Sequence, residues 1–193
     1  MGAGADLIGF NFSSQSARCV TVDKVESILR SAPKGFSRVG VFQNMPADEV
    51  TAIAKRLGLH FLQLHGDENP DDYREASVPI IKAFHVATPA DVQRAGQSTA
   101  DYILFDTPSV TGGGGGQTFD WSLLKDFSRP YFVAGGLNPG NVGQVIKELR
   151  PYGVDVTSGV ESSPGKKSQP LLKAFLNEAR SAEGHIFSDL RGR

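Results

Sequence analysis

The fold of this chain is decided by two segments, Tyr131-Phe-Val-Ala-Gly-Gly-Leu-Asn-Pro139 and Val154-Asp-Val-Thr-Ser-Gly-Val-Glu-Ser-Ser163. Each begins with a short apolar run that is typical of a buried strand, and each run stops at a turn that contains glycine. Asn138 is a good N-cap residue and Pro139 suits the first position of a helix. We therefore expect a helix to begin there, directly after the first strand and its turn.

The turns that follow these two strands are suited to bind a phosphate group. Gly135 and Gly136 follow the first strand, and Ser158 and Gly159 follow the second. Each turn presents free backbone N–H groups beyond the C-terminal end of a strand, and two such turns side by side form a cradle for an anion. A purely structural explanation is that the glycines only permit tight turns. Their recurrence in two adjacent units, together with hydroxyl side chains, favours phosphate binding.

Strand-like and helix-like segments alternate along the rest of the chain. Strands are expected at residues 6–12, 37–43, 60–64, 78–84 and 102–105, and a closing helix at 168–182. Apolar strands without two-residue hairpin turns indicate a parallel sheet with helices outside it. The even spacing favours a (β/α) barrel, in which a phosphate site often follows the last two strands. A dinucleotide-binding fold is disfavoured because no G-x-G-x-x-G motif follows the first strand.

Length, net charge and cysteine content limit the class of protein to which this chain can belong. A length of 193 residues suits one domain with a substantial core, so we assign residues 1–182 to a barrel and 183–193 to a polar tail. The net charge of −1 argues against a nucleic-acid or membrane-surface binder. We find no membrane-spanning run and no signal segment. Cys19 is the only cysteine, which excludes an intrachain disulfide or a cysteine zinc cluster and favours a cytoplasmic location.

Five motifs occur in order, each where a strand is expected to end. They are Gln63-Leu-His-Gly-Asp-Glu68, Phe105-Asp106, Gly116-Gln-Thr-Phe-Asp-Trp121, Ala134-Gly-Gly-Leu-Asn-Pro139 and Asp155-Val-Thr-Ser-Gly-Val-Glu-Ser162. Together they resemble the phosphoribosylanthranilate isomerase family, from about Gly4 to Phe175. The resemblance implies a single-domain (β/α)8 TIM barrel of tryptophan biosynthesis. It also implies an Amadori rearrangement of N-(5-phosphoribosyl)anthranilate, a phosphosugar substrate, without metal or organic cofactor.

This chemistry needs a general acid to open the ribose ring and a general base to remove the proton from C2. By resemblance the acid is Asp106, whose preceding apolar strand would raise its pKa. Arg18 would bind the anthranilate carboxylate through its planar guanidinium. Without the resemblance, Asp106 reads as a capping residue and Arg18 as a solvated loop charge. The phosphate would be held by Gly135, Gly136, Ser158 and Gly159. We expect structural roles for His65, Phe119 and Trp121.

The sequence departs from the family at its start. The family's first strand carries a Lys-x-Cys-Gly motif whose cysteine is the general base, and Cys19 does not match it. We therefore expect a seven-stranded barrel without the first β/α unit, with open sheet edges at residues 6–12 and 154–156. Three alternatives remain. The chain is an isomerase impaired by loss of the base, a catalytically inactive phosphosugar-binding remnant, or another phosphate-binding barrel enzyme such as an epimerase or an indole-glycerol-phosphate synthase relative.

Overall fold

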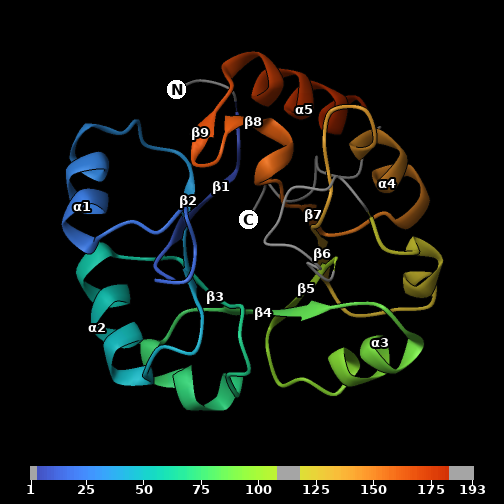
Figure 1. Cartoon of the computed structure of the whole chain (residues 1–193). Helices are drawn as coiled ribbons and strands as arrows, with labels where there is room; N and C mark the ends of the chain where they lie inside the picture. The colour runs from blue at the N-terminus through green and yellow to red at the C-terminus, as the bar shows by residue number, and fades with distance from the viewer. Residues whose placement is uncertain (1–3, 108–117, 183–193) are drawn as a thin grey trace.

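The structure, a computed structural model, describes residues 4–107 and 118–182. Seven parallel strands follow one another around the sheet in the order β1 to β7, and the helices lie outside them (Figure 1). The strands are β1 (Leu7–Asn11), β2 (Ser37–Phe42), β3 (Phe61–Leu64), β4 (Ile80–His85), β5 (Tyr102–Asp106), β6 (Tyr131–Val133) and β7 (Gly153–Val154). The prediction of a parallel sheet with outer helices is confirmed. The predicted tail and the run of five glycines at residues 112–116 lie outside the described residues.

The covering helices are α1 (Val22–Ser31), α2 (Ala47–Leu57), α3 (Pro89–Gly96), α4 (Val142–Leu149) and α5 (Gln169–Ala182). Three 3-10 segments accompany them, η1 (Pro70–Ala76), η2 (Trp121–Leu124) and η3 (Ser158–Val160), and a small antiparallel hairpin joins β8 (Glu161–Ser163) to β9 (Lys166–Lys167). Among the described residues, no helix is long and apolar enough to cross a bilayer.

The sheet curls but keeps a seam between its first and last strands. Within the described ranges, β1 pairs only with β2, and β7 pairs only with β6. Ile8 on β1 is 38% exposed, whereas the apolar residues of the central strands are almost all buried. The fold is therefore a curled half-barrel of seven parallel strands.

Alternate residues along the strands divide between two apolar clusters, as the period of a strand requires. Ile103, Phe105 and Val133 belong to a cluster that also contains helical residues, so they face the outer helices. Leu104 and Phe132 belong to a second cluster that consists of strand residues with Ala134 and Tyr152 and contains no helical residue, so they fill the barrel interior. Phe119 is buried in the outer cluster and Trp121 packs against it, as predicted.

The start of α4 corrects one prediction. The helix begins at Val142 with Asn141 at the N-cap, and not at Asn138 and Pro139. The side-chain amides of Asn138 and Asn141 both donate to the Gly136 carbonyl, over 3.2 and 3.0 Å. The backbone N–H of Asn138 donates to Oδ1 of Asn141 over 2.8 Å. These bonds fold residues 138–141 into a turn, which delays the helix by one turn.

Candidate active site

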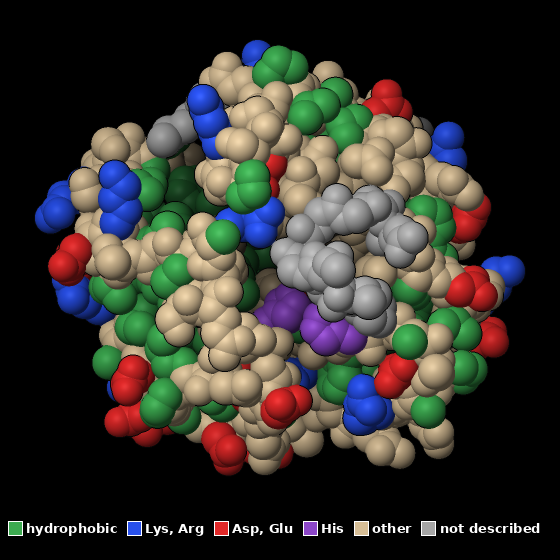
Figure 2. Space-filling view, viewed as in Figure 1, with side chains coloured by type: hydrophobic (Ala, Val, Ile, Leu, Met, Phe, Trp, Pro, Cys, Tyr) green, Lys and Arg blue, Asp and Glu red, His purple; other side chains and the backbone are tan. Residues whose placement is uncertain are grey.

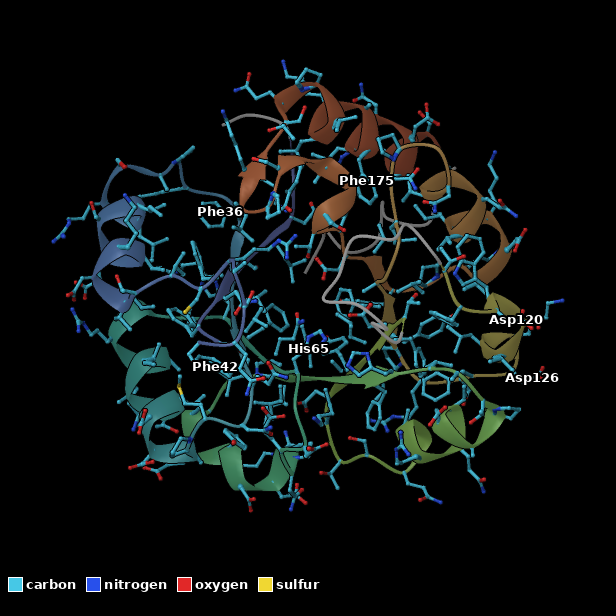
Figure 3. All side chains as sticks on the ribbon, viewed as in Figure 1. Phe36, Phe42, His65, Asp120, Asp126 and Phe175 are labelled. Carbon is cyan, nitrogen blue, oxygen red and sulfur yellow. The ribbon has the colours of Figure 1, made fainter. Side chains whose placement is uncertain are left out.

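The C-terminal ends of the strands bring polar side chains together in the centre of the sheet. Inner positions alternate along each strand, so His65 lies one inner position beyond Gln63, and Asp106 one beyond Leu104. Figure 3 shows His65 at the centre of the ring of strands, and Figure 2 shows histidine side chains in a hollow on the same face. The rings of His65 and His85 are 5.7 Å apart between centroids. This end is the one where catalytic groups of such barrels gather.

The predicted acid contacts a histidine. Nε2 of His65 lies 3.3 Å from Oδ2 of Asp106, and Nδ1 of the same ring lies 3.1 Å from Nε2 of Gln63. An amide nitrogen only donates, so Nδ1 must accept and Nε2 carries the proton. We therefore assign to His65 the tautomer that donates to Asp106. His65, for which the sequence suggested a structural role, is in contact with the predicted site.

Asp106 also fits closely against the first predicted phosphate turn. Its Oδ1 accepts a hydrogen bond from the Thr107 amide over 2.7 Å. Gly135 has φ of +80°, and a Cβ atom there would lie 2.6 Å from that Oδ1 and overlap the Thr107 amide nitrogen. Both the positive φ of the turn and the close contact with the Asp106 carboxyl thus require a glycine at position 135. The sequence alone did not connect these two residues.

A second carboxyl, Asp155, lies at the same end of the sheet. It directly follows β7, and its amide donates to the Val133 carbonyl over 2.9 Å. Burial raises the pKa of Asp155, and the negative charge of Asp106 raises it further, against opposing influences that include His65 and Lys167. A carboxyl with a raised pKa keeps its proton to higher pH. From the sequence, Asp155 was only a reserve candidate, with Cys19, for the base that would act if the bare chain proved active.

The two predicted phosphate turns are in direct contact. A Cβ atom at Gly159 would overlap the Leu137 carbonyl oxygen and lie 2.9 Å from its carbon. Ser158 and Gly159 open η3, and the first amides of such a segment have no partner within it. Gly136 adopts φ of +66°, in the left-handed region. The structure thus brings all four predicted residues into one small region, at the ends of β6 and β7.

Arg18 is held by a carboxylate of the protein. Its Nε and Nη2 lie 2.9 and 2.7 Å from Oε1 and Oε2 of Glu161, a residue whose side chain is 4% exposed. Nζ of Lys167 lies 3.2 Å from Oε1 of the same residue. Hydrogen bonds from Arg18 lower the pKa of Glu161, although burial opposes them. The sequence contained no indication of this pair, because its members are separated by most of the chain.

A buried ion pair supports the turn that carries His65. Oε2 of Glu68 lies 3.1 Å from Nζ of Lys82 and accepts the Gly66 amide over 2.8 Å, while Oε1 accepts the Asn44 amide over 2.6 Å. Both side chains are buried. Burial raises the pKa of Glu68, but the hydrogen bonds from Asn44 and its own turn, and the pairing with Lys82, outweigh it and lower the pKa. Glu68 thus ties the ends of β2 and β3 to the middle of β4.

Within residues 4–107 and 118–182, no group of three or more His, Cys, Asp or Glu side chains is arranged to hold a metal ion. That the reaction needs no metal or cofactor stays a prediction.

Comparisons with known proteins agree with one another. A family model described as N-(5'phosphoribosyl)anthranilate (PRA) isomerase matches residues 1–178. The N-(5'-phosphoribosyl)anthranilate isomerase of Oceanobacillus iheyensis is 41% identical over 182 residues, covering 92% of this chain and 88% of that protein. The enzyme of Myxococcus xanthus is 40% identical over 186 residues, covering 93% and 88%.

Solved structures show the same relationship. The phosphoribosyl anthranilate isomerase of Thermotoga maritima superimposes with a TM-score of 0.84 at 37% identity, covering 93% of this chain and 90% of that one. A phosphoribosyl anthranilate isomerase in complex with reduced 1-(o-carboxyphenylamino)-1-deoxyribulose 5-phosphate gives 0.81 at 35% identity, covering 93% and 89%.

Proposed function

Because the chain belongs to the N-(5'-phosphoribosyl)anthranilate isomerase family, we propose that its strand ends serve the family's reaction with the residues described above. The reaction is the Amadori rearrangement of N-(5'-phosphoribosyl)anthranilate to 1-(2-carboxyphenylamino)-1-deoxyribulose 5-phosphate. Asp106 protonates the ring oxygen and opens the ribose. The observation that carries this assignment is the contact of Asp106 with both His65 and the glycine turn at position 135.

The substrate is held at its two anionic ends. The phosphate lies against the amides of the two contacting turns, formed by Gly135, Gly136, Ser158 and Gly159. Arg18 receives the carboxylate of the anthranilate ring, because a guanidinium presents paired N–H donors to a carboxylate. With both anionic ends held, the ribose would lie between the two anchors, within reach of Asp106. His65 orients the acid, and Asp155, which keeps its proton to higher pH, provides a further donor beside it.

The general base comes from a strand that fits the seam between β1 and β7. The proposal rests on the unpaired edges of these strands within the described residues and on the absence of a Lys-x-Cys-Gly motif from the sequence. Cys19 is exposed in the loop after β1, so it is a poor candidate for the base. Closure of the seam by an eighth parallel strand would complete the (β/α)8 barrel. The open seam also favours the second candidate function, a phosphosugar-binding barrel that does not catalyse.

Growth of a tryptophan auxotroph that lacks the isomerase tests the proposal. The bare chain is compared with the same chain preceded by a strand that carries Lys-x-Cys-Gly. We expect strong growth only with the added strand. Phosphosugar binding by both chains without growth by either would favour the non-catalytic alternative. We also propose a cytoplasmic location and no nucleic-acid partner, which the single free cysteine and the net charge of −1 support.

A further inference from the structure

We propose that Glu161 is a positioning residue, which fixes Arg18 in the orientation that receives the substrate carboxylate. The inference rests on the proposed function and deepens it. In this role Glu161 neither touches the reacting atoms nor binds the substrate. It acts through Arg18, which is separated from it by nearly the whole chain and reaches it across the seam between the two ends of the sheet.

The geometry of the pair leaves one side of the guanidinium available. An arginine has five N–H donors, which form two paired faces, one from Nε and Nη2 and one from Nη1 and Nη2. Glu161 engages the first face, through Nε and Nη2. Among the hydrogen bonds of the described residues, none uses Nη1 of Arg18. The second face is thus the one left for a carboxylate of the substrate.

The charges at this place favour a further anion. Two cations, Arg18 and Lys167, contact the single carboxylate of Glu161. One positive charge therefore remains in excess around a carboxylate that is nearly fully buried. Glu161 is held ionised, because the hydrogen bonds from Arg18 lower its pKa. A buried carboxylate with two cationic partners has little freedom to move. The Arg18 side chain, which is bound to it through two donors, is therefore restrained as well.

Glu161 also connects the two anchors of the substrate. It follows η3 directly, and the first residues of η3 form half of the proposed phosphate site. Lys167 lies opposite Glu161 in the β8–β9 hairpin, and its ammonium donates to the Thr157 carbonyl over 2.6 Å. One short segment therefore shapes the phosphate turn and holds the arginine for the carboxylate. The distance between the two anchors is set by this segment.

Calorimetry with the full chain tests the role, with two probes. The first is reduced 1-(o-carboxyphenylamino)-1-deoxyribulose 5-phosphate, and the second is the same compound without the ring carboxylate. We expect Glu161→Gln to weaken binding of the first probe by about tenfold or more, the range for loss of one ordered charged contact. Binding of the second probe should change less than about threefold. Glu161→Asp, which keeps the charge, should recover part of the affinity.

The controls separate the possible causes. Glu75 is an exposed partner of Lys55 at 3.9 Å, so Glu75→Gln should leave both affinities unchanged. In an Arg18→Ala background, Glu161→Gln should have no further effect on the first probe, because the residue acts through Arg18.

Tighter binding of the first probe by Glu161→Gln would show that Glu161 competes with the substrate, and equal losses for both probes would show a role in the phosphate turn. Either result overturns the proposal. Failure of the unaltered chain to bind either probe would overturn the proposed function itself.

Discussion

The Nε2 atom of His65 lies 3.3 Å from Oδ2 of Asp106, and this contact joins the ends of β3 and β5, two strands that are not neighbours in the sheet. Gln63, on the other side of the ring, determines which nitrogen carries the proton. The proposed role of Asp106 as the acid requires that its carboxyl be held in one orientation, and this arrangement provides it.

Replacement of Asp106 by Asn should remove most of the turnover and leave binding of the reduced product analogue within a few-fold. General acid catalysis contributes about 10²–10⁴-fold in rate, and an amide keeps the shape of the carboxyl without its proton. The rate is measured in whichever chain, with or without the added strand, supports growth of the auxotroph. Asp48→Asn, at an exposed position on α2, is the matched control. Turnover close to that of the unaltered chain would remove Asp106 from the role of acid.

Gln63→Leu should lower turnover by roughly tenfold, within the range expected when a supporting hydrogen bond of an active-site group is lost. The substitution removes the donor to Nδ1 of His65, so the two neutral tautomers become mixed. Nitrogen NMR of the ring should show the Nε2–H form in the unaltered chain and a mixture in the variant. His60, whose Nδ1 accepts the Arg38 amide over 2.9 Å, provides an internal reference. An unchanged His65 spectrum in the variant contradicts the assignment.

Gly135→Ala should reduce both stability and turnover, whereas Gly35→Ala should reduce stability alone. Both glycines have positive φ, +80° and +105°, so each alanine carries a backbone cost of about 1–2 kcal/mol. Only at position 135 would the new Cβ press on Asp106 and Thr107, since nothing lies within 4 Å of it at position 35. Urea denaturation and steady-state rates measure the two effects. Equal turnover in the two variants would show that the close fit at position 135 has no functional consequence.

Asp155 and Glu161 should give opposite contributions to stability as the pH changes. Burial raises the pKa of Asp155 from its ordinary 3.8, so its contribution is present below that value and is lost as the pH rises through the folded pKa. The pKa of Glu161 is lowered from 4.5, so its contribution is present above that value and is lost as the pH falls through the folded pKa. Asp155→Asn should therefore flatten the decline in unfolding free energy toward neutral pH. A decline of unchanged slope would contradict the shift.

Lys82→Met should lower the free energy of unfolding by about 3–5 kcal/mol, because it leaves the buried Glu68 carboxylate without its cation. Lys55→Met removes an exposed partner of Glu75 and should change stability by less than about 0.5 kcal/mol. Urea denaturation of both variants gives the comparison. A small effect of Lys82→Met would show that the hydrogen bonds from the Asn44 and Gly66 amides are enough to stabilise the buried Glu68 carboxylate.

Much of this fold could be predicted from the sequence, because strand and helix periods are local properties. The ends of the strands before Asp106 and Gly135 could also be predicted from the sequence, because a polar residue or a glycine interrupts an apolar run there. The start of α4 was not, because Asn138 and Asn141 are both good caps and the choice depends on the Gly136 carbonyl. The last strand was expected at residues 154–156 and is Gly153–Val154. It lies at the edge of the sheet, so its length is limited by its pairing with the single neighbouring strand β6.

The contacts around the candidate site were beyond sequence reasoning for a different reason. The pairs His65 with Asp106 and Arg18 with Glu161 depend on how far each strand is shifted along its neighbours. Hydrophobic patterns fix which face a residue occupies but not its height in the barrel. Resemblance to the family supplied roles for single residues and left the partners of those residues unnamed.

The seam has a consequence for the order in which the molecule assembles. Every ladder of the main sheet joins strands that are consecutive in the chain, so each of them closes a short loop. The two ends meet instead through charged side chains, namely Arg18 with Glu161, and Arg180 with Asp6 at 3.3 Å. Arg180 and Asp6 are both exposed to solvent, and a contact between such charges weakens as salt screens it. We expect the sheet to form progressively from local pairs and its two ends to join last, in a step whose rate falls as ionic strength rises.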